Sequence, residues 1–327
     1  MKRRAWLGSI PALGVLAARA RAAADAQTLT KLVASYGSIE GSQTPLWVAF
    51  EAGYFRAAGL DVELVYQASS TQVPALLSGD VQIAQVGGPE VASVNLSGAD
   101  LVILATLGAV FPYQFMVAAD IKTPAQLRGK TIGVSRFGDV SDAATRIALR
   151  RVGVDPKEVS FVQVGSSVNR TAALIGGTIQ GGVQSPPATF LLQAHGLHPL
   201  FDLAALKIAA ATATVAARRS WVAAHHDLVQ SFIDALLQGV RRERTDENFT
   251  VGVMKKYFKS EDDREMHLSW NYFAKQVVPA VPYPRVEQFT ASLAEMATGN
   301  EKLAGYDVSK MLDDSFLHSA SARLRIR

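Results

Sequence analysis

Apolar and polar positions alternate between helical and strand spacing along the first two-thirds of the chain. Within residues 45–58, Leu46, Phe50 and Tyr54 recur at intervals of four and therefore share one face of a helix. Residues 60–66 follow after a glycine and place apolar side chains at every second position, which predicts a strand. This stretch therefore predicts an amphipathic helix that packs on a core, followed by a strand.

The same alternation repeats, with further strands and helices separated by short polar loops. We expect strands at 29–36, 60–66, 81–86, 101–107, 111–118, 131–134, 159–164, 179–184 and 209–216. We expect helices at 70–77, 90–96, 123–127, 143–152, 169–175 and 186–195, then a helical tail at 227–242, 249–258, 262–276, 286–297 and 308–316. Alternating strands and helices predict parallel sheets covered by helices, and a restart near residue 112 predicts two α/β units.

The N-terminus is typical of an export signal. Basic residues 2–4 precede the apolar segment 7–18, and Ala24-Asp25-Ala26 gives a cleavage pattern. We therefore expect a signal peptide at 1–26 and a periplasmic protein, exported by the general secretion route or, given Arg3-Arg4, by the twin-arginine route.

Charge and cysteine content exclude several classes of function. Without residues 1–26 the chain has 28 basic and 28 acidic residues, so its basic balance gives no reason to expect nucleic-acid binding. The absence of cysteine excludes thiol catalysis and cysteine-ligated zinc. No HExxH, GxSxG or SxxK motif is present, and the six histidines are not spaced as a metal set. We expect no cofactor, no metal and no catalysis.

Four segments resemble one family of binding proteins. They are PLWVAFEAGYFRAAGLDVEL (45–64), ALLSGDVQIA (75–84), LRGKTIGV (127–134) and residues 306–313. They are similar to the nitrate/taurine/sulfonate-type solute-binding proteins of ABC importers, which include SsuA/THI5-like proteins. The resemblance implies an α/β type II periplasmic-binding fold with a hinge and a helical C-terminal tail. Its first lobe would comprise 27–110 and 214–327, its second lobe 111–213, with hinge segments at 108–113 and 212–218.

Loops that join strands to helices are the candidate ligand site, because ligands of such sheets bind beyond the carboxyl ends of the strands. The resemblance implies a ligand on the same loops. The expected ligand-binding residues are Ser42, Gln43, Thr44, Gly87, Gly88, Ser135, Phe137, Gly138, Asp139, Ser141, Gln184 and Ser185.

Several side chains near these loops have two interpretations. Asp139 or Ser141 could cap the following helix, and Ser141 could instead donate to a ligand oxygen. Phe137 is either a lid or part of the core. Arg136 is expected to pair with Asp139 or Asp142 rather than with a ligand. Four aromatic residues are candidates for either a ligand wall or the core: Phe111, Tyr113, Trp270 and Tyr272.

The balance of charge indicates the kind of ligand. Glu40, Glu90, Asp139 and Asp142 lie in or beside the loops, against Arg136 as the main cation. A simple oxyanion such as nitrate is therefore less expected than a hydrogen-bonded organic molecule.

The resemblance and the charge balance together predict a monomeric protein that captures a small polar organic solute and delivers it to an ABC permease in the inner membrane. The solute would be sulfonate- or taurine-like, a carboxylate or pyrimidine-like. The alternatives are an enzyme with the same fold that acts on a small metabolite, and a ligand-sensing periplasmic protein.

Overall fold

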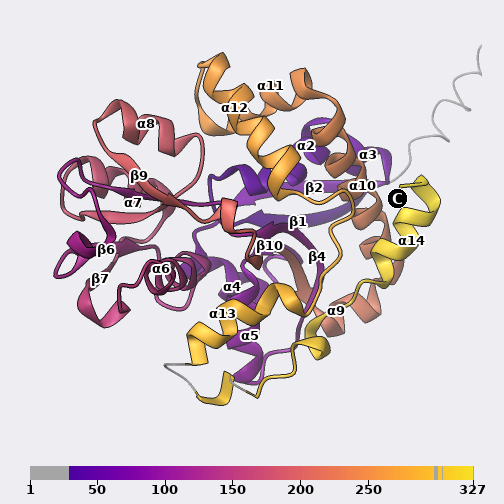
Figure 1. The fold of residues 1–327 in the computed structure, drawn as a ribbon. Helices are drawn as coiled ribbons and strands as arrows, with labels where there is room; N and C mark the ends of the chain where they lie inside the picture. The colour runs from indigo at the N-terminus through magenta and orange to yellow at the C-terminus, as the bar shows by residue number, and fades with distance from the viewer. Residues whose placement is uncertain (1–28, 298–300, 304, 327) are drawn as a thin grey trace, which may run out of the picture.

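Two five-stranded sheets, one in each lobe, form the framework of the protein (Figure 1). The computed structural model describes residues 29–297, 301–303 and 305–326. The first sheet has the order β2-β1-β3-β10-β4 and consists of β1 (Thr30–Tyr36), β2 (Leu60–Tyr66), β3 (Ile83–Val86), β4 (Leu101–Val110) and β10 (Ala209–Arg218). The second has the order β7-β6-β8-β5-β9 and consists of β5 (Gln114–Val117), β6 (Thr131–Val134), β7 (Ser160–Gln163), β8 (Gly181–Gln184) and β9 (His198–Asp202).

The two sheets share one plan, in which three parallel strands are followed by an antiparallel strand in fourth position. That strand is β10 in the first sheet and β5 in the second. Each is the first strand formed after the chain has crossed from the other lobe. The predicted architecture of two α/β lobes followed by a helical C-terminal region is therefore confirmed.

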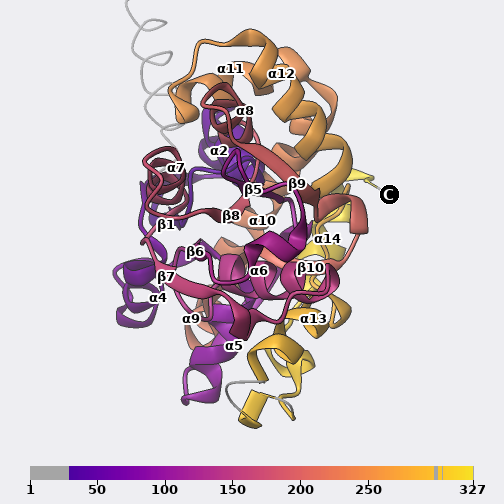
Figure 2. The same ribbon diagram turned by 60° about the vertical axis from the view of Figure 1, so that its left-hand side comes forward.

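Helices cover the sheets and form the C-terminal tail (Figure 2). In the first two-thirds of the chain they are α2 (Thr44–Glu51), α3 (Tyr54–Ala57), α4 (Ser69–Ser78), α5 (Gly88–Leu96), α6 (Val140–Arg151), α7 (Ser167–Ile175) and α8 (Ala188–Ala194). In the tail they are α9 (Arg219–Ala224), α10 (His226–Thr245), α11 (Glu247–Phe258), α12 (Asp263–Tyr272), α13 (Glu287–Ala297) and α14 (Ser315–Leu324). Within the described residues, no helix combines the length and the apolar character needed to cross a membrane.

The apolar face of residues 45–58 packs the core of the first lobe. Trp47 is fully buried and stacks on Tyr257 of α11 with ring centroids 4.5 Å apart. The single predicted helix is two helices, because Gly53 has a φ of 72° and separates α2 from α3. Glycine takes this left-handed conformation without the steric penalty of a side chain.

The tail contacts both lobes. Helix α10 packs on α2, and α14 packs on α10. Helix α13 packs on β10 and also on α6 of the second lobe, where Arg150 pairs with Glu295 at 2.8 Å. The tail therefore stabilises the present arrangement of the two lobes as well as the first lobe itself.

The chain crosses between the sheets after β4 and after β9. The first crossing, residues 111–113, coincides with a predicted hinge segment, whereas the second crossing is residues 203–208. The second predicted hinge segment, 212–218, lies inside β10, where pairing with β3 and β4 restrains the backbone. The predicted boundary at 214 lies in the same strand, so the division into lobes at 111 and 214 stays a prediction.

The structure differs from the expected secondary structure at several places. Strand β9 was not predicted, because Pro199 interrupts its alternation; proline is tolerated there because β9 is an edge strand. Residues 308–311 form a single 3₁₀ turn instead of the predicted helix, and α14 begins only at Ser315, whose N–H donates to Asp313. The predicted signal peptide, 1–26, lies outside the described residues.

The contact between α2 and α10 gives a test of this packing. A Cβ at Gly239 would lie 2.5 Å from the carbonyl oxygen of Pro45 and 2.6 Å from the Cβ of Ala49. We expect Gly239→Ala to lower the free energy of unfolding by about 1–3 kcal/mol, because the two helices must separate. Gly252→Ala is the control, since a Cβ on this α11 glycine meets nothing within 4 Å. It should be neutral or stabilise by up to about 1 kcal/mol. Denaturant unfolding that affects both variants equally would contradict this packing.

Candidate ligand site

A small polar cavity of about 60 Å³ lies between the two lobes. We call it the polar cavity. Its walls come from the loops after β1, β3, β6 and β7, together with Tyr113 and Thr212. These loops follow the carboxyl ends of parallel strands, where ligands of such sheets bind. Gly87 allows a close approach on one side, because a Cβ there would lie 2.2 Å from the carboxylate oxygen Oε2 of Glu90.

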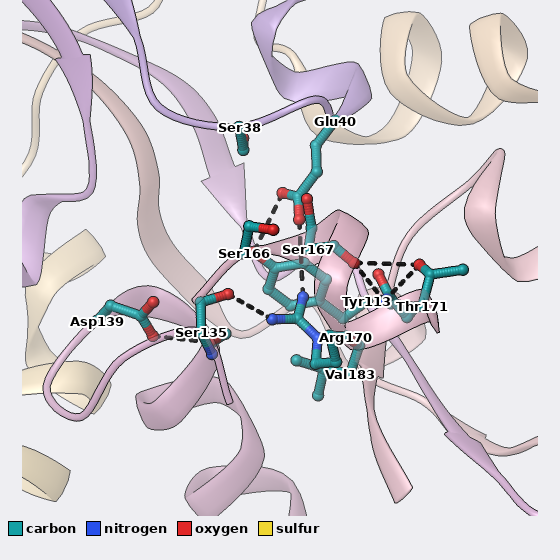
Figure 3. Close-up of polar contacts among 12 residues, drawn as sticks. Ser38, Glu40, Tyr113, Ser135, Asp139, Ser166, Ser167, Arg170, Thr171 and Val183 are labelled. Atoms are coloured by element: carbon teal, nitrogen blue, oxygen red, sulfur yellow. Dashed lines mark hydrogen bonds and ion pairs between the residues drawn. The ribbon is translucent and has the colours of Figure 1, made fainter. Parts of the chain in front are cut away.

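Arg170 of α7 lines this cavity, and its exposed fraction is only 1%. Its Nε donates to the carbonyl oxygen of Val183 at 2.7 Å, and Nη1 donates to the Ser135 hydroxyl at 2.6 Å. Its Nη2 lies 3.8 Å from Oε1 of Glu40. Figure 3 shows Glu40 extending from the first lobe toward this guanidinium group. Two of the five N–H donors of Arg170 are therefore hydrogen bonded within the protein, and Nη2 forms an ion pair.

Three buried carboxyl groups belong to the same cavity: Glu40, Glu90 and Asp139. Glu40 lies 3.4 Å from the Tyr113 hydroxyl, which donates to it. Asp139 accepts hydrogen bonds from the Ser141 hydroxyl at 2.7 Å and from two backbone N–H groups. The Arg170 guanidinium thus acts on Glu40 and Asp139, whereas the cation that acts on Glu90 is Arg136.

Burial raises the pKa of all three carboxyl groups. The pKa of Glu90 rises from 4.5 to about 8, because the group is desolvated and lies near Asp139. Desolvation also raises the pKa of Glu40, although Arg170 opposes the shift. The pKa of Asp139 is raised by desolvation, against the hydrogen bond from Ser141. Glu90 is therefore mainly protonated at neutral pH in this conformation.

Unused hydrogen-bond acceptors are the second property of the polar cavity. Among the described residues, three buried side-chain oxygens from its lining have no hydrogen-bond partner: Oε1 of Gln43, Oε1 of Gln85 and Oε2 of Glu90. The amide orientation of Gln85 is fixed, because its Nε2 donates to the carbonyl oxygen of Ser42. Buried polar atoms without partners are costly, so the two amide oxygens, which can only accept, indicate a ligand that donates hydrogen bonds.

The predicted site residues fall into three groups. Those that line the polar cavity are Gln43, Gly87, Ser135, Asp139 and Ser141. Those that line a neighbouring, larger cavity are Gln184 and Ser185. Those outside the lining of both cavities are Ser42, Thr44, Gly88, Phe137 and Gly138. The part that any of them plays in binding stays a prediction.

The structure distinguishes between the roles expected for the loop 135–142, confirming one and correcting others. The Ser141 hydroxyl donates to Asp139, so its hydrogen is already engaged within the protein. Asp139 does cap α6, by accepting from the N–H of Asp142. The side chain of Asp142 pairs with Arg146 at 2.7 Å, not with Arg136. Phe137 is 49% exposed, so its interpretation as a core residue is wrong.

The four aromatic candidates lie in different environments. Tyr113 lines the polar cavity. Phe111 belongs to the core of the second lobe, and Trp270 donates its indole N–H to the carbonyl oxygen of Glu243. Tyr272 packs against Phe273 with ring centroids 5.2 Å apart. Of the four, only Tyr113 is among the residues that line either cavity.

The sequence prediction missed Arg170 and did not count Glu40 or Glu90 as binding residues. Arg170 could have been found from its loop, because Ser166 and Ser167 open α7 at the same edge of the sheet as the loops that were chosen. The described residues contain no group of three or more His, Asp and Glu side chains placed to hold a metal ion.

Comparison with known proteins identifies relatives. Residues 41–243, more than half of the chain, match the family described as NMT1/THI5 like. The Formylaminopyrimidine-binding protein of Halalkalibacterium halodurans is 28% identical over 125 residues, which cover 37% of this chain and 38% of that relative.

Solved structures show the fold. A protein of Bordetella bronchiseptica RB50 has a TM-score of 0.79 at 18% identity, over 90% of this chain and 98% of that chain. The periplasmic nitrate-binding protein NrtA of Synechocystis PCC 6803 has a TM-score of 0.73 at 16% identity, over 91% and 90% of the two chains. The fold is therefore that of periplasmic binding proteins, and the predicted resemblance to nitrate/taurine/sulfonate-type binding proteins is confirmed.

The raised pKa of Glu90 predicts how stability changes with pH. The folded protein binds this proton more tightly than the unfolded chain, so the stabilisation is complete below about pH 4.5 and decreases as the pH rises toward about 8. Glu90→Gln cannot ionise. The Tm of the unmodified protein should fall between about pH 5 and pH 8. We expect the Tm of Glu90→Gln to fall by several degrees less over the same range. The exposed Glu63→Gln serves as the control and should follow the unmodified protein. Identical losses of Tm in all three proteins would show that Glu90 does not carry this proton.

Proposed function

The chain belongs to the NMT1/THI5-like family, and on this premise we propose that it is the periplasmic solute-binding component of an ABC importer. Its solute is a small nitrogen base that donates hydrogen bonds, such as an amidine or an aminopyrimidine. The two lobes hold this solute between them, and the complex docks on a permease in the inner membrane.

One observation carries the choice of solute. The unpartnered buried atoms of the polar cavity noted above are the amide oxygens of Gln43 and Gln85, which can only accept, and Oε2 of Glu90, which is an acceptor when the carboxyl group is ionised. An amidine or aminopyrimidine presents N–H groups on one edge of a planar unit and can donate to several acceptors at once. Protonation of such a base adds a charge that the buried carboxyl groups stabilise.

Simple anions fit this cavity less well. An anion site normally offers Arg or Lys donors to the ligand. Here two Arg170 N–H groups donate to Val183 and Ser135, and Nη2 pairs with Glu40. Nitrate or a sulfonate would also lie beside the carboxyl groups of Glu40, Glu90 and Asp139, which oppose the charge of Arg170. The curated relative that is named for a formylaminopyrimidine supports a nitrogen base over the anions for which other members of the fold are named.

Export and transport are the remaining part of the proposal. The expected signal peptide at 1–26 supports export. A structural neighbour from Staphylococcus aureus, named as the ligand binding component of an ABC-type import system, supports a permease as partner. We expect this permease in the inner membrane and the binding protein to be a monomer.

Catalysis is the alternative, and Glu90 is the observation in its favour. A carboxyl group with a pKa of about 8 is suited to proton transfer near neutral pH. The two functions differ in the fate of the ligand. A binding protein returns the solute chemically unchanged after denaturation, as mass spectrometry would show, whereas an enzyme returns a product.

Calorimetry tests the proposed selectivity. We expect acetamidinium and 4-aminopyrimidine to bind the protein that starts after residue 26, and nitrate and methanesulfonate not to bind. Glu90→Gln should weaken acetamidinium binding roughly ten- to a hundredfold, because one charged acceptor is lost. Glu63→Gln, exposed on β2, should bind like the unmodified protein. Binding of the anions without the bases would refute the proposed solute.

Proton release gives a second test of the same site. A bound cation stabilises the ionised form of Glu90 and lowers its pKa, so acetamidinium should displace a proton near pH 7. The binding enthalpy measured in buffers of different ionisation enthalpy should reveal a release that approaches one proton per ligand. The release should disappear in Glu90→Gln; a release that persists in this variant would assign the proton to another group.

A further inference from the structure

A second cavity of about 470 Å³ adjoins the polar cavity, and we call it the apolar cavity. Glu40 and Ser167 line both cavities, so the two cavities are neighbours that meet at these side chains. The remaining walls of the apolar cavity come from α7, from the start of α8 and from the connection between α11 and α12. The polar cavity alone is much smaller than the roughly 300–1,000 Å³ of sites for drug-sized ligands.

Helix α7 has one buried face and one face that lines the apolar cavity. Arg170 and Leu174 point into the second lobe and are buried. Val168 and Ile175, seven positions apart on another face, line the apolar cavity and are 55% and 37% exposed. Leu191 of α8 continues this apolar surface at 46% exposure. Apolar side chains therefore gather next to the carboxyl groups and remain exposed to water.

The opposite wall belongs to the tail. Phe258 at the end of α11 and Glu265 of α12 line the apolar cavity across from α7 and α8. Figure 2 shows α11 and α12 on the same side of the molecule as α8. The lobes already touch nearby through Glu40 and Arg170, and again through Arg150 and Glu295. The apolar cavity is thus present although the two lobes are in contact at these two ion pairs.

We propose that the apolar cavity receives an uncharged apolar substituent of the same solute whose nitrogen base occupies the polar cavity. This inference rests on the proposed function for the position of the base. The solute is then an amphiphile with a hydrogen-bond-donating head and an alkyl or aryl group. The shared residues Glu40 and Ser167 lie where the two parts of the solute join.

The affinities of a homologous series of linear amidinium ions test whether an alkyl group of the ligand enters the apolar cavity. Acetamidinium, butanamidinium and hexanamidinium share one head and differ only in the length of the alkyl chain. Each methylene buried in the apolar cavity should increase the affinity measured by calorimetry about three- to fourfold. Chains that stay in water should give no gain.

Two leucine variants test where the alkyl chain of the ligand binds. Leu191→Gln places a polar side chain in the apolar cavity and should reduce the gain per methylene, while leaving acetamidinium binding unchanged. Leu206→Gln is the matched control, because Leu206 is 43% exposed, close to the 46% of Leu191, and lies outside both cavities. Both leucines are exposed, so neither substitution should unfold the protein.

The outcomes separate the two proposals. If acetamidinium binds but longer chains bind no more tightly, the apolar substituent is refuted and the proposed function stands. If the gain in affinity per methylene is the same in both leucine variants, the alkyl chain of the ligand lies outside the apolar cavity and the inference is again refuted. If acetamidinium and its homologues all fail to bind, the proposed solute class fails and this inference fails with it.

Discussion

Burial of Arg170 together with Glu40, Glu90 and Asp139 is the constraint on which the site depends. Removing charged groups from water costs several kcal/mol for each ion unless partners compensate. The protein meets this cost for Arg170 with three partners and for Asp139 with hydrogen bonds at the start of α6. Glu90 has no such set of partners, and its pKa rises until the neutral form dominates near neutral pH. Such a group is expected where a ligand supplies the missing partner.

The two sheets explain why these groups meet. Because both have the same order, with three parallel strands beside one antiparallel strand, the carboxyl ends of β1, β3, β6 and β7 face the same space between the lobes. The C-terminal tail contributes a contact between the lobes and one wall of the cleft. Helix α13 joins the lobes through Glu295, and the α11–α12 connection forms the far wall of the apolar cavity. A polar and an apolar compartment therefore result from one cleft.

Much of this could be predicted from the sequence, because local periodicity determines it. Apolar alternation located nearly all the strands, and the strand-to-helix loops led to Ser135, Asp139 and Gly87, which line the polar cavity. The loop before α7 could have pointed to the neighbourhood of Arg170, but helical periodicity did not predict its burial, since a charged residue on an amphipathic helix is normally assigned to the exposed face. Its burial depends on the carbonyl oxygen of Val183, which the fold supplies. The apolar cavity could not be predicted either, because its lining combines Phe258 at the end of α11 with residues of α7 and α8, which are far apart in the sequence.

A crystal structure of the protein with acetamidinium tests the central claim most directly. We predict both nitrogen atoms within about 2.7–3.2 Å of acceptor oxygens in the polar cavity, with Oε2 of Glu90 among them. The methyl group should then point toward Glu40 and Ser167, where the apolar cavity begins. Electron density for the ligand outside the cleft, or an anion bound to Arg170 in its place, would contradict a site built for a nitrogen base.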